Sequence, residues 1–311
     1  MKNFKTSNPA VSIALCTYNG ERFLREQLDS ILNQEYENIA EIVCVDDRST
    51  DSTWSILNEY ANKYSVFKAV KNDINLGFIK NYEKAITLCN NNLIAISDQD
   101  DIWYASKISK LVNSIGDGLM IYSDNEYIDE DGNLLGVKFS DKRNLTTTSS
   151  CLNFTLFNGI SGHTVLFKRE MLVYALPFPA DIHYDWWLAF CASQHSVIQY
   201  IPEPLVGYRQ HISNAVGGYG VKKSDKKVKT YNILNETRIR ISFFAEHINP
   251  KLVNEKRILE FLTLSYTRKS LIMRIKRVIL FWQNREDFLL FKKRSKIRKM
   301  IYCLKAFWKY D

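Results

Sequence analysis

The sequence has few of the residues that mark disulfide frameworks, repetitive chains and membrane spans. Its 311 residues include only 6 prolines, 12 glycines and 6 cysteines, which excludes a collagen-like or low-complexity protein. The cysteines are not spaced as C-x-x-C and most lie in apolar runs, so free thiols in a reducing compartment are favoured over disulfides or a zinc knuckle. The sequence contains no run of 18 apolar residues that would span a membrane.

Charge is distributed unevenly along the chain. Residues 1–220 contain 18 Lys/Arg and 26 Asp/Glu, a net charge of −8, and residues 221–311 contain 24 and 8, a net charge of +16; the two values sum to +8. A glycine-rich and lysine-rich stretch over 217–227 marks the junction. We therefore predict an acidic domain over 1–220 and a basic extension over 221–311 that meets something anionic.

Apolar runs alternate with helical periodicity over residues 1–125. Strands are predicted over 11–16, 41–45, 66–70 and 93–97, with helices over about 23–32, 53–64 and 78–91. Because strands that alternate with crossover helices form parallel sheets, the pattern predicts an α/β fold whose ligands lie beyond the carboxyl ends of the strands. The short apolar run that ends at Cys16 leads into Thr17 without a cleavage-like site, so it is interpreted as the first strand of a cytosolic protein.

The pattern changes after residue 119. Further strands are predicted over 119–123, 164–167, 197–200 and 205–208, with a hairpin turn at 129–133. Helices are predicted from about residue 168, over 184–194, and through most of 231–311.

The acidic run Asp98-Gln99-Asp100-Asp101 carries the strongest chemical signal. Three carboxylates at the end of an apolar strand repel one another unless a positive group binds them. A divalent cation is such a group, because Mg²⁺ usually takes one or two carboxylates together with substrate phosphate oxygens. The alternative is a polar turn that caps the helix beginning near Ala105.

Asp46 and Asp47 end the second predicted strand in a similar way. One of them could accept a hydrogen bond from a pyrimidine N–H or a ribose hydroxyl. The alternative is that the pair caps the following helix together with Arg48 and Ser49. These residues alone leave both interpretations open.

Taken in order, these segments resemble the family 2 glycosyltransferases with the GT-A fold. The resemblance rests on VSIALCTYNG (11–20), QLDSILNQ (27–34), VDDRSTD (45–51), NLG (75–77) and DQDD (98–101), and continues with YDWW (184–187) and EPLVGYRQH (203–211). The last segment is similar to the one that closes the site in bacterial O-antigen and capsule enzymes, above all in the rhamnosyltransferase-like subgroup. The sequence departs from the family at Arg48, where members more often have glycine.

The resemblance implies a Rossmann-like, mostly parallel central sheet with helices on both faces. Residues 1–125 would form the nucleotide-sugar-binding half and 126–220 the acceptor and catalytic half. The implied reaction is an inverting, metal-dependent sugar transfer from a nucleotide donor, with Mn²⁺ or Mg²⁺ at the diphosphate. L-rhamnose from dTDP-rhamnose is the first choice of donor, and UDP-glucose, UDP-galactose or a nucleotide-linked N-acetylhexosamine are the alternatives.

The resemblance also implies roles for individual residues. Tyr18 would stack on the base, Asp47 would accept from its N3–H with Asp46 beside it, and Asp98 would lie near the ribose or a metal-bound water. The other residues implied to bind the donor are Thr17, Asn19 and Glu21.

The remaining implied residues belong to the metal and the acceptor. Asp100 would be the direct metal ligand, and His211 would reach the metal or the diphosphate unless it is a polar residue satisfied elsewhere. Asp185 would be the general base for the acceptor hydroxyl. Trp186 and Trp187 would contact the acceptor, and core packing is their alternative.

The basic extension has two interpretations. Residues 265–311 contain 14 Lys/Arg and 3 Asp/Glu, and one helical face gathers Leu271, Ile272, Ile275, Val278, Ile279 and Trp282. Such a helix can lie in an anionic membrane surface. The resemblance implies a lipid-linked saccharide acceptor, and therefore a cytoplasmic enzyme peripheral to the inner face of a bacterial cell membrane. The alternative is packing against the catalytic domain.

Other classes of function stay open. The chain could be a scaffold that binds nucleotide sugars without catalysis, although the presence of Asp100, Asp185 and His211 argues against this. Nucleic-acid binding through the basic extension is not expected, because the sequence contains no recognised module for it. A nucleotidyltransferase is disfavoured because no glycine-rich phosphate loop lies near the N-terminus.

Overall fold

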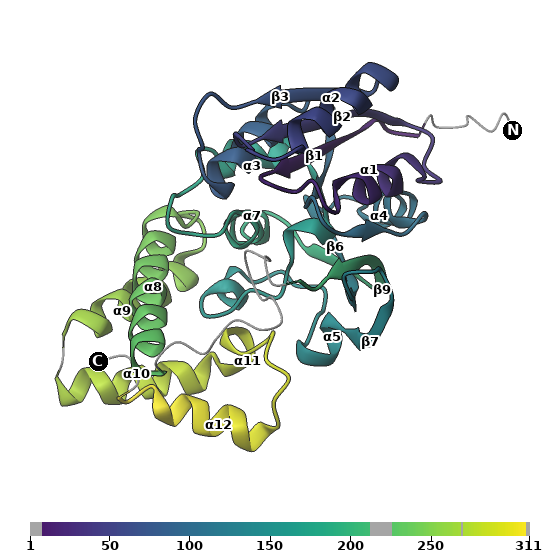
Figure 1. The fold of residues 1–311 in the computed structure, drawn as a ribbon. Helices are drawn as coiled ribbons and strands as arrows, with labels where there is room; N and C mark the ends of the chain where they lie inside the picture. The colour runs from purple at the N-terminus through teal and green to yellow at the C-terminus, as the bar shows by residue number, and fades with distance from the viewer. Residues whose placement is uncertain (1–7, 212–225, 269, 309–311) are drawn as a thin grey trace, which may run out of the picture.

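The computed structural model describes residues 8–211, 226–268 and 270–308 (Figure 1). Within these residues the strands form one nine-stranded sheet, in the order β3-β2-β1-β4-β8-β6-β9-β5, with β7 paired to β6. The four predicted strands of the N-terminal half are all present and pair in parallel. They are β1 (Val11–Thr17), β2 (Ile39–Asp46), β3 (Phe67–Lys71) and β4 (Leu93–Ser97).

Helices cover both faces of this parallel part of the sheet. Successive side chains of β1 point to opposite faces: Ile13 and Leu15 pack in one core cluster with α1 and α2, and Ala14 packs in the other with α3. The α/β fold expected from the sequence is therefore confirmed. The helices are α1 (Leu24–Leu32), α2 (Thr53–Lys63) and α3 (Phe78–Leu88).

The second half of the sheet is mixed. The predicted hairpin joins β6 (Met120–Ile128) to β7 (Leu134–Lys138), while β8 (Val165–Lys168) lies antiparallel to both β4 and β6. The two strands predicted over 197–200 and 205–208 form one strand, β9 (Ile198–Arg209), parallel to β6, with irregular register between Ser123 and Glu126. Parallel pairing thus holds for β1–β4 and for β6 with β9, but not across β8.

Short elements complete the part of the chain before the basic extension. β5 (Ile102–Trp103) pairs with the end of β9 and leads into α4 (Lys107–Ser114). The helix predicted from about residue 168 is a 3₁₀ turn followed by α6 (Leu172–Ala175), which is shorter than expected. The remaining helices of this part are α5 (Phe139–Lys142) and α7 (Tyr184–Ser193).

The basic extension packs on residues 8–211 through one face. The ring of Phe244 stacks on that of Phe190 in α7 at 3.8 Å, and Asn153 donates to the carbonyl of Asp287 at 3.2 Å. Packing against the body, one of the two alternatives, is therefore observed. The extension consists of α8 (Lys226–His247), α9 (Val253–Thr267), α10 (Leu271–Gln283), α11 (Arg285–Phe288) and α12 (Lys296–Lys305).

The last helices of the extension lie far from the first strands of the sheet. In Figure 1, α10 and α12 lie at the end opposite to β1–β3. None of the described helices is both long and apolar enough to cross a bilayer. The predicted domain boundary at residues 220 and 221 falls outside the described residues and stays a prediction.

Candidate active site

The acidic loop that follows β4 lies at the carboxyl edge of the parallel strands, where a ligand site was predicted. Its three carboxylates occupy different environments. Asp98 and Asp100 are partly exposed, whereas Asp101 is fully buried. The side chain of Gln99 bonds both the N–H and the carbonyl of Tyr18, at 2.9 and 3.1 Å, and so fixes this loop to the end of β1.

Asp100 and His211 meet although 111 residues separate them. His211 lies two residues beyond the end of β9, and its Nε2 is 2.9 Å from Oδ2 of Asp100. Neighbouring ligands of one octahedral cation stand about 3 Å apart when metal–oxygen bonds are about 2.1 Å. A carboxylate oxygen and an imidazole nitrogen at this separation fit a divalent cation such as Mn²⁺ or Mg²⁺.

A second group of possible ligands lies behind the first. Ligand atoms of Asp98, Asp101 and His163 all fall within 4.8 Å of one another, and His163 is buried. Its Nδ1 is 3.2 Å from Oδ2 of Asp98 and 3.5 Å from Oδ2 of Asp101. Asp101 Oδ2 and the other ring nitrogen of His163 are buried and make no hydrogen bond in the structure.

The amine of Lys107 lies beside this second group. Its side chain is fully buried, and its Nζ donates to the carbonyl of His163 at 2.6 Å. Burial lowers the pKa of Lys107 well below its usual range, and the carboxylates of Asp101 and Asp98 oppose that shift. The Lys107 amine therefore lies within electrostatic range of both carboxylates, and Asp100 with His211 is the other candidate pair of metal ligands.

Burial also sets the protonation of the two aspartates in this group. It raises the pKa of Asp101 to about 7, and the negative charges of Asp100 and Asp98 act in the same direction. For Asp98 the effect of burial is outweighed by hydrogen bonds from His163 and from the Tyr82 hydroxyl, which hold its pKa below the usual value. Asp98 is thus the carboxylate kept charged beside the metal site.

Arg209, at the end of β9, is a fully buried arginine that braces the acidic loop. Its Nε donates to the carbonyl of Asp100 at 2.9 Å, and its N–H to the carboxylate of Asp101 at 3.1 Å. The guanidinium also bonds the carbonyl of Glu130 at 2.7 Å and pairs with Glu26 in α1. Arg209 therefore positions both Asp100 and, through the end of β9, His211.

The aspartates that end β2 accept hydrogen bonds from the protein itself. Asp46 is fully buried and accepts from the N–H of Ser49 at 3.0 Å, from the Ser49 hydroxyl, and from Thr17 at 3.1 Å. Asp46 therefore closes a turn over residues 46–49, whereas α2 begins at Thr53 after Ser52, so the alternative that Asp46 caps the following helix is not observed. The nucleotide contacts suggested for Asp46 and Thr17 stay predictions. Both side chains are buried, so neither presents an exposed group to a nucleotide.

Asp47 organises a neighbouring loop. Its carboxylate accepts from the backbone N–H groups of Leu76 and Gly77 at 2.7 and 2.9 Å, and from Asn72 at 2.7 Å. Gly77 has φ of 78°, a conformation that favours glycine. The Asn75-Leu76-Gly77 segment is therefore held against β2, and contact between Asp47 and a base stays a prediction.

The loop after β1 is bonded to the loop after β2. The side chain of Asn19 accepts from the N–H of Thr50 at 2.9 Å, and that of Glu21 accepts from the N–H of Ser52 at 2.8 Å. Tyr18 is 50% exposed, so its ring is accessible to a base. Asn19 and Glu21, which were predicted to bind the donor, thus make contacts between the two loops. The ring of Tyr18 is exposed, and its stacking on a base stays a prediction.

Arg48 explains why glycine is common at its position in the family. Its φ is 64°, in the left-handed region that L-residues adopt at a cost of about 1–2 kcal/mol. The side chain is exposed. The departure from the family pattern therefore places an L-residue in a conformation that favours glycine.

Asp185, the predicted base, lies in the first turn of α7 and faces the same region as the acidic loop. Burial raises its pKa to about 6, and the charge of Asp98 adds to this effect. The link between the two is short: the Tyr82 hydroxyl donates to Asp98, and the Tyr82 ring lies 4.1 Å from the ring of Tyr184. A carboxylate with this pKa can accept a proton near neutral pH.

The two tryptophans after Asp185 differ. Trp187 is 3% exposed, donates to the carbonyl of Ala175 at 2.7 Å and packs on Phe190, so the acceptor contact suggested for it is replaced by core packing. Trp186 is only partly buried and lies 3.7 Å below the guanidinium carbon of Arg240. Contact with an acceptor stays a prediction for Trp186 alone.

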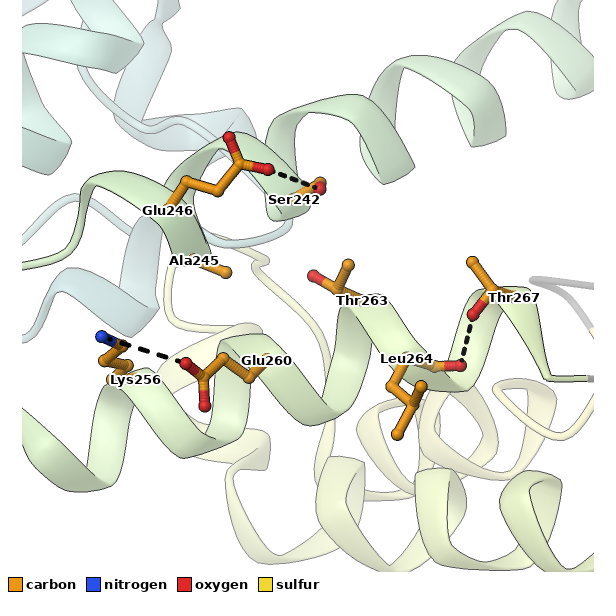
Figure 2. Close-up of a pocket in the computed structure, with 8 residues that line it drawn as sticks. All are labelled: Ser242, Ala245, Glu246, Lys256, Glu260, Thr263, Leu264 and Thr267. Atoms are coloured by element: carbon orange, nitrogen blue, oxygen red, sulfur yellow. Dashed lines mark hydrogen bonds and ion pairs between the residues drawn. The ribbon is translucent and has the colours of Figure 1, made fainter.

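A shallow groove of about 460 Å³ lies elsewhere, between α8 and α9 (Figure 2). Its lining combines threonine, leucine and an ion pair between Lys256 and Glu260, whose nitrogen and oxygen are 4.0 Å apart. It includes none of the residues of the strand-end loops. We therefore place the chemistry at the acidic loop rather than in this groove.

Comparison with known proteins decides the family. The sequence model described as "Glycosyl transferase family 2" matches residues 12–173, just over half of the chain. The chain belongs to the family 2 glycosyltransferases. An uncharacterized glycosyltransferase of Haemophilus influenzae is 28% identical over 281 residues, which are 85% of this chain and 83% of that protein.

Two further similarities bear on the site. The dTDP-rhamnosyl transferase RfbG of Shigella flexneri is 33% identical over 220 residues, 65% of this chain and 73% of that protein. The crystal structure of S. aureus TarS 1–349 in complex with UDP-GlcNAc aligns with a TM-score of 0.56 at 17% identity, covering 89% of this chain and 81% of that one. This likeness supports the GT-A fold.

Several residues of the site were not singled out by sequence reasoning. His163, Lys107 and Arg209 carry no metal-binding or nucleophile motif; His163 and Arg209 reach the acidic loop from distant segments, and Lys107 reaches it from the start of α4. The one available signal was the position of Arg209 two residues before His211, within a segment already singled out.

Proposed function

We propose that this family 2 glycosyltransferase is an inverting, metal-dependent enzyme that moves a sugar from a nucleotide donor to a saccharide acceptor during polysaccharide synthesis. The observation that carries the proposal is the meeting of Asp100 with His211 at 2.9 Å, with Asp185 in electrostatic contact with the same loop. This arrangement supplies a place for the donor diphosphate and a base for the acceptor.

Asp100 and His211 would hold the cation, and Arg209 would keep Asp100 in place. When bound, a divalent cation stabilises the negative charge that develops on the departing nucleoside diphosphate. The charged carboxylate of Asp98 would sit beside the ribose, and the exposed ring of Tyr18 would stack on the base.

Asp185 would act on the acceptor. Inversion requires the acceptor hydroxyl to attack from the side opposite to the leaving group, and the base must take its proton on that side. A pKa of about 6 leaves Asp185 largely ionised at neutral pH and still basic enough to accept a proton.

The proposed donor is dTDP-L-rhamnose. Support comes from the similarity to the dTDP-rhamnosyl transferase RfbG. UDP-linked sugars are the second candidate, supported by 34% identity over 128 residues to an Escherichia coli enzyme named UDP-Glc:alpha-D-GlcNAc-diphosphoundecaprenol beta-1,3-glucosyltransferase WfaP, 41% of this chain and 50% of that one. We propose a lipid-linked saccharide acceptor and a position on the inner face of the cell membrane.

One experiment separates donor binding from catalysis. Thermal melting with dTDP or UDP and Mn²⁺ identifies the nucleotide, because a ligand that binds the folded state raises the melting temperature. Release of nucleoside diphosphate is then measured with the matching sugar and acceptor. We expect Asp185→Asn to slow release about 10²–10⁴-fold while the donor still stabilises the protein.

Asp181→Asn is the matched control, because Asp181 is an exposed aspartate just before α7. It should leave both measurements unchanged. Release at the wild-type rate by Asp185→Asn contradicts the assignment of the base. Donor binding by the wild-type protein with no release in the presence of any acceptor favours the non-catalytic scaffold.

A further inference from the structure

The outer sides of α10 and α12 form an exposed apolar surface, which we call the α10–α12 surface. On α10 the side chains of Leu271, Ile272 and Ile275 are 64%, 65% and 47% exposed. On α12 those of Ile297, Ile301 and Leu304 are 66%, 42% and 50% exposed. Isolated exposed aliphatic residues are common, but a group of this size on two adjoining helices marks an interaction surface.

This surface is not an unfinished part of the core. The opposite sides of the same helices are already packed: Phe281 is fully buried in α10, and Tyr302 and Cys303 are buried in α12. The buried guanidinium of Arg277 donates to the carbonyls of Ala306 and Phe307, at 2.7 and 3.1 Å, and so fixes α10 to the end of α12. The two helices therefore present their outer sides as one fixed unit.

Basic residues accompany the apolar side chains. α10 contains three Lys/Arg and α12 contains four, and neither helix contains Asp or Glu. Lys276 on α10 and Arg298 and Lys305 on α12 are exposed. Aliphatic side chains flanked by cations are the pattern of helices that lie in the plane of a membrane surface, where each basic residue contributes attraction to anionic lipid.

We propose that the α10–α12 surface binds anionic phospholipid membranes, with its aliphatic side chains inserted at the boundary between headgroups and acyl chains. A second copy of the chain is a poorer occupant, because a symmetric pairing would set these lysines and arginines against their own copies. The surface lies at the end of the molecule away from β1–β3 (Figure 1). Membrane binding would bring a lipid-linked acceptor within reach, and this consequence rests on the proposed function. The membrane binding itself does not rest on it.

The test is flotation of the full chain with lipid vesicles, without any sugar donor. The vesicles are phosphatidylcholine alone or phosphatidylcholine mixed with phosphatidylglycerol. The wild-type protein should float with the anionic vesicles and much less with the neutral ones, and added salt should weaken the binding. The triple variant Ile272→Ser/Ile275→Ser/Ile297→Ser should lose at least about tenfold in vesicle affinity.

The control variant is Leu134→Ser/Val173→Ser/Val253→Ser, which removes three equally exposed aliphatic residues elsewhere. It should float like the wild type, and unchanged melting curves verify that each variant is folded. A second readout is the fluorescence of Trp282, 45% exposed on α10, which should shift to the blue with anionic vesicles and lose that shift in Trp282→Phe.

Failure of the wild-type protein to bind anionic vesicles overturns the proposal, as does equal binding by the α10–α12 triple variant. A different outcome is that the wild-type protein binds no vesicles, and light scattering detects a dimer that the same variant abolishes. That result assigns the surface to a second copy instead. Sugar transfer to a water-soluble acceptor is measured separately. Its presence without vesicle binding leaves the proposed function standing and removes only the membrane surface.

Discussion

Two parallel strands that flank β1, β2 and β4, lead into aspartates, and the protein uses the two groups of carboxylates differently. At the end of β2, Asp46 and Asp47 accept hydrogen bonds from backbone and side-chain donors of their own loops. At the end of β4, the Asp100 carboxylate lies 2.9 Å from Nε2 of His211, and the buried Oδ2 of Asp101 accepts no hydrogen bond within the described residues. The β2 carboxylates hold their loops in place, whereas Asp100 and His211 are the pair proposed to bind a cation.

The largest expected effect that tests this contrast is on Asp100. Asp100→Asn should lower sugar transfer about a thousandfold or more, because the neutral amide is a weak metal ligand and the lost charge stabilisation is worth several kcal/mol. The melting temperature without metal should stay near the wild-type value. Steady-state release of nucleoside diphosphate across a Mn²⁺ titration measures the effect.

Asp117→Asn, at an exposed position after α4, is the control for this variant. If Asp100→Asn released nucleoside diphosphate at the wild-type rate at every Mn²⁺ concentration, the proposed difference between the β2 and β4 strand ends would be contradicted.

The opposite result is expected at the end of β2. Asp46→Ala leaves the Ser49 N–H, the Ser49 hydroxyl and the Thr17 hydroxyl without their acceptor, and should lower the free energy of unfolding by about 1–3 kcal/mol. Transfer per folded molecule should fall far less than in Asp100→Asn. Urea denaturation together with active-site titration separates the two effects, and a variant of wild-type stability that cannot transfer sugar would reverse the assignment.

A smaller effect concerns pH and the base that faces the β4 loop. Because Asp185 must be ionised to accept a proton, and its pKa is about 6, transfer should fall about tenfold for each pH unit below that value. The folded-state pKa lies above the ordinary value of 3.8, so ionisation costs stability as pH rises from about 4 to 6.

Asp185→Asn removes this ionisation cost. It should therefore raise the free energy of unfolding at pH 7 by about 1–2 kcal/mol, after allowance for partial exposure, while at pH 3.5 it should have little effect. Melting curves at the two pH values provide the measurement. A variant less stable than the wild type at pH 7 would show that the carboxylate is held by attraction rather than strained by burial.

The smallest expected effect returns to the end of β2. Arg48→Gly should raise the free energy of unfolding by about 0.5–1 kcal/mol, because glycine adopts φ of 64° without strain but loses more entropy on folding. Arg48→Ala is the matched control, since it removes the charge and keeps the Cβ atom. Equal melting temperatures for the two variants would trace the effect to the charge and not to the backbone.

The sequence predicted much of the first half of the fold because its apolar runs end in polar clusters that coincide with the strand ends. Val11–Thr17 and Leu93–Ser97 were found in this way. The order of the remaining strands was not predictable: β8 is short, and nothing in Val165–Lys168 indicates that it lies between β4 and β6. The two prolines at 202 and 204 made one strand look like two.

The site was predictable only where its residues stand in motifs. The sequence singled out Asp100, Asp185 and His211 because the segments around them are similar to a known family, and their roles stay predictions. His163 and Lys107 were missed because their contacts with the acidic loop span 65 residues or depend on complete burial. Hydrogen bonds that close across such separations follow from the finished packing and leave no local pattern in the chain.

The guanidinium of Arg209 has a consequence for anyone who wishes to exchange parts between related enzymes. One planar group joins the acidic loop to the β6–β7 turn at Glu130 and to α1 at Glu26. A hairpin transplanted from a relative without its matching arginine and glutamate would place its turn carbonyl differently. That displacement would be passed on to the candidate metal site. The turn, the helix and the loop must therefore be transplanted together.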